Sequence, residues 1–168
     1  MKPLCPPDTH HLSAAEGWLE LGDPDEALAE LEKITPSMCG HIHVLSLRWL
    51  VFARLKQWTV CVEIGNSMVA AAPKLQFGWI QRSFALHELK KTKEARDLLL
   101  PVVEKFPKDT TIPYNLACYE CQLGDLKAAR RWLEKTLAMK GAKMIKRQAL
   151  EDPDLAPLRD EIAQLQTE

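Results

Sequence analysis

Apolar residues recur along this chain at spacings of three and four, which is the period of an amphipathic helix and not that of a strand. Short polar turns separate the apolar runs. The pattern predicts helices paired in hairpins, with bounds near 9–21 and 24–35, 42–55 and 58–72, 76–89 and 92–106, and 110–123 and 126–139. We therefore expect an all-α fold.

The four predicted hairpins share the same landmarks at a spacing of 34 residues. The turns begin at Gly22, Lys56, Lys90 and Gly124, and a leucine precedes each of them. Five residues after each turn begins stands a small side chain, at Ala27, Cys61, Ala95 and Ala129. Since no gap is needed to keep this register, we interpret the chain as a repeat protein.

Local signals fix some details of these helices. Asp23 is a predicted N-cap with Pro24 in the first helical position, and Asp125 is the equivalent cap further along. Pro101 falls inside a predicted helix and should kink it. Trp49 and Gly65 exchange the sizes expected at their positions, so we expect the indole to occupy the space that the glycine leaves.

The pattern resembles the tetratricopeptide repeat family, with repeats at 8–41, 42–75, 76–109 and 110–141. The residues that match it are Ala15 and Ala117 at the eighth repeat position, Ala27, Ala95 and Ala129 at the twentieth, and Pro73 and Pro107 at the thirty-second. The resemblance implies a right-handed superhelical solenoid of antiparallel hairpins. We expect a single domain over 1–168, in which 142–168 forms C-terminal capping helices with an apolar stripe of Leu155, Leu158, Ile162 and Leu165.

The resemblance also implies that the first helix of each hairpin lines a concave groove. Its surface here is apolar and aromatic with a few amides, which suits an amphipathic helix or an extended peptide. The predicted partner-binding residues are Phe77, Ile80, Phe84, His87, Tyr114, Asn115 and Gln122. The alternative is that Ile80, Phe84 and Leu50 pack between helices. A clamp for a chaperone's C-terminal carboxylate, another use of this family, lacks its basic residues here, and only Asn115 is of the right kind.

Candidate chemistry is sparse. Cys118 and Cys121 lie on one predicted helical face and His87 could lie near, but a structural zinc site takes four ligands, so apolar cysteines at a helix interface are the favoured interpretation. The sequence contains no phosphate-binding glycine loop and no His-Glu-x-x-His motif. We therefore predict no enzyme activity, no cofactor and no metal site.

Cysteine usage and hydropathy bear on the compartment. The odd count of five cysteines argues against a disulfide scaffold and favours a reducing environment. No apolar run is long enough to cross a bilayer, and the first residues carry no secretory signal. The expectation is a cytoplasmic protein with no membrane contact.

Charge is distributed unevenly although the net charge is −1. Residues 1–32 carry eight acids and one base, a net −7, whereas 127–147 carry eight bases, Lys140 among them, and one acid, a net +7. Trp132 is the only aromatic residue of the basic stretch, which argues against nucleic acid. The favoured interpretation of the basic stretch is a solvated helix face. The alternative is that the acidic end of one copy docks on the basic end of another, a head-to-tail contact that would form a homo-oligomer.

The predicted function is a non-enzymatic protein–protein interaction scaffold that binds a partner peptide or helix in the concave groove. Two alternatives stay open at this point. One is a salt-sensitive self-assembling scaffold that uses the oppositely charged ends. The other is a secretion-type chaperone for an exported protein.

Overall fold

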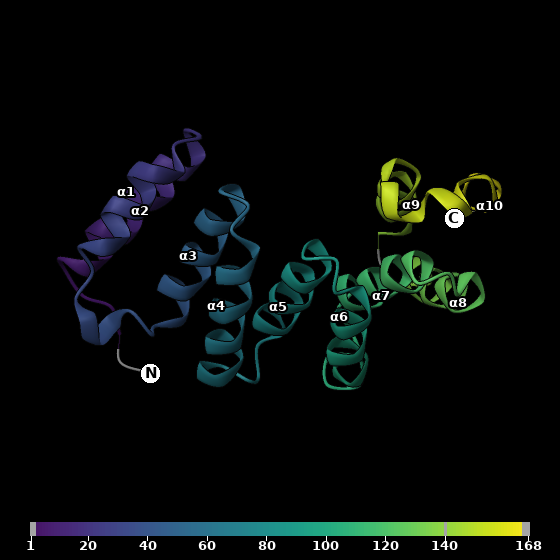
Figure 1. The fold of residues 1–168 in the computed structure, drawn as a ribbon, viewed down its shortest axis with the longest axis horizontal. Coiled ribbons are helices and arrows are strands. Elements are labelled where there is room, and N and C mark those ends of the chain that lie inside the picture. The colour runs from purple at the N-terminus through teal and green to yellow at the C-terminus, as the bar shows by residue number, and fades with distance from the viewer. Residues whose placement is uncertain (1–2, 140, 166–168) are drawn as a thin grey trace. The chain divides into compact units, whose positions relative to one another are not determined.

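The computed structural model describes residues 3–139 and 141–165, and all regular structure within these ranges is helical (Figure 1). The predicted all-α fold class is therefore confirmed. The chain divides into two compact units, Met1–Leu89 and Lys90–Glu168.

The first unit contains two antiparallel hairpins and one further helix. These elements are α1 (Asp8–Glu20), α2 (Pro24–Glu32), the short 3₁₀ helix η1 (Pro36–Met38), α3 (Ile42–Arg54), α4 (Trp58–Ala71) and α5 (Gln76–Glu88). Each helix packs on the next along the chain, and the most extensive packing is between α4 and α5.

The second unit is built in the same way and ends in shorter elements. It contains α6 (Thr92–Leu99), η2 (Leu100–Val102), α7 (Thr111–Gln122), α8 (Leu126–Leu137), α9 (Ala142–Glu151), η3 (Pro153–Leu158) and α10 (Arg159–Gln164). The 3₁₀ helix η3 packs on α7, and α9 packs on α8 and α10.

The turns between helices follow the repeat that the sequence shows. The helices α2, α4, α6 and α8 begin at residues 24, 58, 92 and 126, and the turn residue two positions earlier has a positive φ in every case. At Gly22 and Gly124 that left-handed conformation is unstrained, whereas Lys56 and Lys90 adopt it at a steric cost. The predicted caps are confirmed, since the Asp23 and Asp125 carboxylates accept hydrogen bonds from the backbone N–H groups of Glu26 and Ala128.

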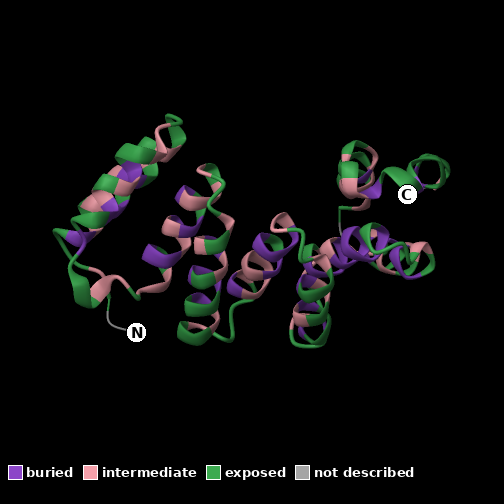
Figure 2. Cartoon of the chain, viewed as in Figure 1, coloured by how far each residue is buried: buried purple, intermediate pink, exposed green. Residues whose placement is uncertain are grey.

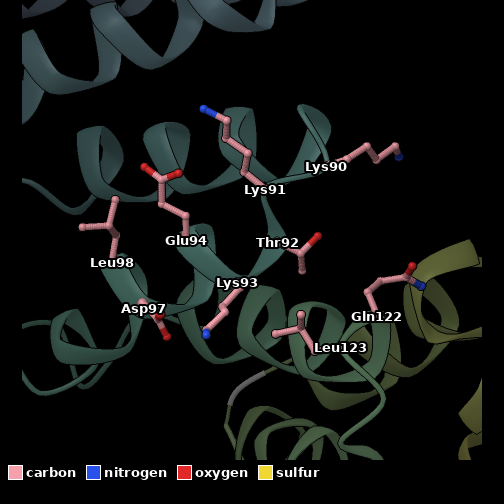
Figure 3. A pocket seen from close by; sticks show the side chains of 9 residues that line it. All are labelled: Lys90, Lys91, Thr92, Lys93, Glu94, Asp97, Leu98, Gln122 and Leu123. Carbon is pink, nitrogen blue, oxygen red and sulfur yellow. The ribbon is translucent and has the colours of Figure 1, made fainter.

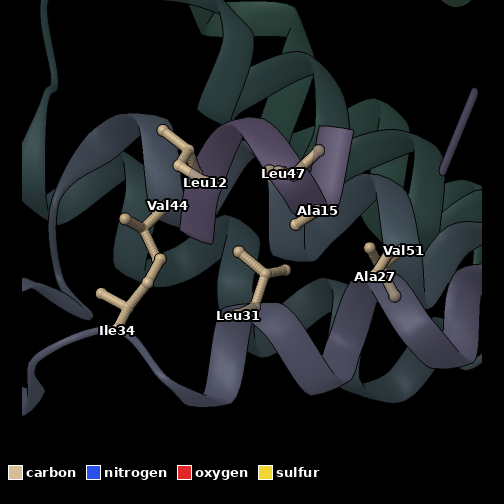
Figure 4. Close-up of a cluster of buried hydrophobic side chains, with 8 residues drawn as sticks. All are labelled: Leu12, Ala15, Ala27, Leu31, Ile34, Val44, Leu47 and Val51. Carbon is tan, nitrogen blue, oxygen red and sulfur yellow. The ribbon is translucent and has the colours of Figure 1, made fainter. Parts of the chain in front are cut away.

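Small and branched side chains close the core of the first hairpin and of α3. The fully buried alanines Ala15 and Ala27 lie on facing helices, with Leu31 beside them. Figure 4 shows these side chains with Val44 and Val51 of α3 completing the cluster. Buried and exposed residues alternate along each helix, as an amphipathic pattern requires (Figure 2).

Gly65 does not leave room for the Trp49 indole, so the predicted size exchange between these residues is wrong. A Cβ on Gly65 would lie 2.8 Å from the Cβ of Arg82 in α5, so the space belongs to a neighbouring helix backbone. Gly78 makes the reciprocal approach, because its Cβ would stand 2.9 Å from that of Met68. Because Gly65 and Gly78 lack a Cβ, they allow α4 and α5 to cross closely.

Pro101 ends a helix, and the kinked helix predicted over 92–106 does not form. The α-helix α6 stops at Leu99, and the chain passes through the 3₁₀ helix η2 around the proline. Proline removes an N–H donor and clashes with the preceding turn, and nothing after it resumes α-helical geometry before α7.

The C-terminal part has the apolar stripe that the sequence indicates. Leu155, Leu158 and Ile162 are buried, and Leu165 is half-buried. Among the described helices, none combines the length and apolar character needed to cross a membrane.

Candidate functional site

The predicted partner-binding residues divide between two helices, one in each unit. Phe77, Ile80, Phe84 and His87 lie on α5, and Tyr114, Asn115 and Gln122 lie on α7. The surroundings of the two sets differ.

On α5, Phe84 is part of an aromatic cluster formed by Trp49, Trp58 and Phe84, one residue from each of three helices. The ring of Phe84 meets that of Trp58 edge-on at a centroid distance of 5.9 Å, and that of Trp49 at 6.3 Å. Phe84 nevertheless stays 36% exposed, and Leu50, next to Trp49 on α3, is 40% exposed. The cluster therefore fixes an aromatic side chain whose outer part faces solvent.

The other α5 residues are more enclosed. Ile80 is half-buried, whereas Phe77 packs from the edge against the core that contains Trp49, Cys61 and Met68. His87 is buried, with 6% of its surface exposed. Phe84 is thus the exposed apolar member of this set, whereas Ile80 and Phe77 are both half-buried.

On α7, the predicted residues contact the chain's own C-terminal segment. The buried Tyr114 hydroxyl donates a hydrogen bond of 2.8 Å to Asp152 Oδ2, and Gln122 Nε2 donates one of 3.0 Å to the backbone carbonyl of Asp154. Burial, and then the hydrogen bond to Asp152, raise the pKa of Tyr114 far above its ordinary range. Asn115 is half-buried.

The segment that covers α7 was missed by sequence reasoning as part of a site. Asp152 begins it, accepting a hydrogen bond from the backbone N–H of Asp154, and Leu155 and Leu158 bury their side chains behind it. The sequence predicts capping helices over 142–168, but nothing in the spacing indicated that the residues after Asp152 return to α7.

A separate pocket of about 750 Å³ lies beside the start of α6 (Figure 3). Its lining includes Lys90, Lys91 and Lys93 together with Glu94 and Asp97. A helix start attracts anions, but here two carboxylates offset two of the three amine charges.

Part of the charge at the two ends of the chain is neutralised locally. In the first hairpin, Glu30 lies 2.9 Å from His11 and 2.6 Å from Lys33, and hydrogen bonds first to Lys33 and then to His11 lower the pKa of Glu30. In the basic stretch, Arg130 is ion-paired with Glu161. Lys2 and Lys140, which the charge counts include, lie outside the described residues.

The comparisons with known proteins agree with this architecture. A family model described as the tetratricopeptide repeat matches residues 9–33, the region of α1 and α2. A search of curated proteins finds no match. The chain is similar in structure to MamA (residues 41 to the end) from Desulfovibrio magneticus RS-1, with a TM-score of 0.73, 16% identity and coverage of 97% of each chain.

A second similar structure is a thermophilic TPR protein, TTC0263, from Thermus thermophilus. Its TM-score is 0.69 at 17% identity, over 93% of this chain and 95% of the other. The first hairpin therefore matches the tetratricopeptide repeat, and the chain has the fold of tetratricopeptide-repeat proteins. This fold is typical of scaffolds for protein–protein interaction, while the number of repeats stays a prediction.

Proposed function

We propose that this chain is a non-enzymatic scaffold that binds a helical or extended segment of a partner protein, with its principal contact at Phe84. The observation that carries the proposal is the position of Phe84, which the aromatic cluster holds in place and which remains partly exposed. An aromatic side chain whose rotamer is already fixed loses little conformational entropy when a partner covers it.

The apolar surface around Phe84 supports a partner with apolar anchors. Leu50 and Ile80 would extend the contact along α3 and α5, and covering the exposed part of a large apolar side chain stabilises a complex by about 1 kcal/mol or more.

The α7 residues take a different part in this proposal. Tyr114 and Gln122 already donate hydrogen bonds to the C-terminal segment, so a partner would meet that segment or compete with it. Asn115, half-buried and without such a bond to the segment, is the α7 residue that we keep as a direct contact.

Quantitative affinity capture tests the proposal. The native protein is compared with Phe84→Glu and with Leu21→Glu, a control in the same unit, because Leu21 is 79% exposed at a hairpin turn and lies outside the aromatic cluster. A charge at position 84 should reduce recovery of the specific partner at least tenfold, while the control keeps it. Equal recovery from all three proteins, with unchanged helix content by circular dichroism, would contradict the proposal.

A second candidate is salt-sensitive self-association through the oppositely charged ends. Exposed acids on the first hairpin, such as Glu16 and Glu20, and exposed bases such as Lys127 and Arg131 favour it. The contact should weaken as salt screens these charges. Light scattering at low and at high salt checks this, and a strict monomer under both conditions would exclude it.

We also infer a cytoplasmic location, supported by five cysteines that are all free thiols. If the captured partner is an exported protein, the scaffold acts as its chaperone before export, and the capture experiment identifies that case directly.

A further inference from the structure

Three potential metal ligands from distant parts of the chain meet where the C-terminal segment covers α7. They are the thiol of Cys118 and one carboxylate oxygen each from Asp152 and Asp154, and these three atoms all lie within 4.8 Å of one another. Cys118 is buried on α7, whereas the two aspartates are half-buried at the start of η3. The ligands therefore come from two elements that fold together.

The spacing of these atoms suits a small tetrahedral ion. Cys118 Sγ lies 3.7 Å from Asp152 Oδ2. A thiolate and a carboxylate oxygen bound to one tetrahedral zinc ion stand about 3.5 Å apart, given the usual zinc–sulfur and zinc–oxygen bond lengths. In the structure this contact is a hydrogen bond from the thiol to the carboxylate, and a bound ion would replace it.

Cys121 offers a fourth ligand one helical turn after Cys118. It is buried, with 4% of its surface exposed, and no hydrogen bond to its thiol is found among the described residues. It stands three residues after Cys118, and side chains at this spacing lie on the same face of a helix.

Hydrogen bonds from neighbouring groups orient the Asp152 carboxylate, as outer-shell hydrogen bonds orient the ligands of a metal site. The Tyr114 hydroxyl donates to Asp152 Oδ2, and the backbone N–H of Asp154 donates to Asp152 Oδ1 at 2.9 Å. These bonds fix the carboxylate plane. No ion pair joins Asp152 to a lysine or arginine in the described part of the chain, and a solvent pocket of about 440 Å³ reaches Asp152, which gives an ion a way in.

We propose that Cys118, Asp152 and Asp154, with Cys121 as the fourth ligand, bind one divalent cation of the zinc class. Thiolate sulfur selects zinc or cobalt over the hard cations magnesium and calcium. The bound ion would link the C-terminal segment to α7 and so hold that segment over the helix face that carries Tyr114 and Cys118. The site is independent of the partner contact proposed at Phe84.

Binding changes the protonation of the site. Without an ion, the Cys118 thiol keeps its proton and donates it in a hydrogen bond to Asp152 Oδ2. When the sulfur–metal bond forms, that proton leaves to the buffer, and a second leaves if Cys121 also coordinates. Affinity should therefore rise with pH in the neutral range.

A cobalt(II) titration of the full chain under reducing conditions tests the site. One ion should bind per chain and produce a thiolate-to-cobalt charge-transfer absorption, and zinc should displace it. Cys118→Ser should abolish that absorption, and Asp154→Asn should weaken binding by at least about tenfold, since even outer-shell losses cost 10–100-fold. Asp154 is half-buried and isosteric with asparagine, so this variant keeps the fold.

Cys39→Ser is the matched control, because Cys39 is a free thiol in the first unit, remote in sequence from the cluster. It should leave the titration unchanged. Loss of the absorption in Cys39→Ser but not in Cys118→Ser would place adventitious binding elsewhere and overturn the proposal. The same holds if magnesium or calcium binds while cobalt gives no thiolate absorption, or if no ion binds at all.

Discussion

The α5 face that carries Phe84 and the α7 face that carries Tyr114 illustrate two outcomes of one helical pattern. On α5, an aromatic cluster supports Phe84 and leaves it partly exposed. On α7, Tyr114 is buried and bonded to Asp152 of the chain's own C-terminal segment. The comparison teaches that an apolar helix face in such a protein stays open to solvent only where the chain itself does not cover it.

The largest effect is expected where the C-terminal segment is anchored. Leu155→Ala removes a fully buried side chain beneath that segment and should cost about 2–5 kcal/mol of unfolding free energy. Urea denaturation followed by circular dichroism measures it. Ala156→Ser, at an exposed neighbouring position, should change stability little. Equal losses in both variants would contradict the view that Leu155 anchors the cover of α7.

The α5 face depends on the close crossing of α4 and α5. Gly65→Ala places a Cβ against the Arg82 backbone and should cost about 1–3 kcal/mol through overpacking. Gly17→Ala is the contrasting change, because nothing lies within 4 Å of the new methyl group on α1. That variant should gain up to about 1 kcal/mol from helix propensity. Thermal unfolding of both variants measures the two changes in stability. A Gly65→Ala variant with unchanged stability would contradict the close crossing of α4 and α5.

A single substitution can remove the side-chain hydrogen bond between Tyr114 of α7 and Asp152 of the C-terminal segment. Tyr114→Phe deletes the hydroxyl that donates to Asp152 and should cost about 1.5 kcal/mol, as expected for a hydrogen bond to a charged acceptor. Hydrogen exchange of η3 should accelerate, while that of α5 stays unchanged. If exchange in η3 does not change, this bond does not hold the segment.

The two faces should also differ in their response to pH. Burial raises the pKa of Cys61, in the core behind the α5 face, to about 11, while burial and then Asp152 and Asp154 raise that of Cys118. Asp152→Asn should therefore lower the pKa of Cys118 and leave Cys61 unaffected. Thiolate absorbance, measured through an alkaline titration with single-cysteine variants, distinguishes the two.

For Cys61 the direction of the linked stability change follows from its raised pKa. The folded thiol keeps its proton to higher pH than the unfolded one, whose pKa is 9.0. The stabilisation linked to this thiol is therefore complete below pH 9 and is lost as pH rises from 9 toward 11. A Cys61→Ala variant should lack that loss.

Much of the fold could be predicted from the sequence because its signals are local. Apolar periodicity and the Asp23 and Asp125 caps act within one or two helical turns, and the turn residues Gly22 and Gly124 need only their own backbone freedom. The errors arose where tertiary contact decides. The size exchange between Trp49 and Gly65 failed because α5 fills the space at Gly65, and a single sequence does not show which helix does so.

The candidate site was less accessible to sequence reasoning. Repeat position placed Phe84 and Tyr114 on equivalent faces, yet their covering depends on where a segment about 40 residues further along the chain returns. The cysteine pair of α7 was noticed, but Asp152 and Asp154 were not connected with it. Helix periodicity gives no information about contacts between residues that are separated by a hairpin and by the end of a further helix.

Site-specific photo-crosslinking in the native host tests the central claim most directly. A photoreactive aromatic residue replaces Phe84 on α5 or, in a second protein, Gln122 on α7, which is exposed but donates a hydrogen bond to Asp154. We expect crosslinks to a partner protein from position 84, and only intrachain crosslinks to the C-terminal segment from position 122. Foreign crosslinks from position 122 with none from position 84 would contradict it.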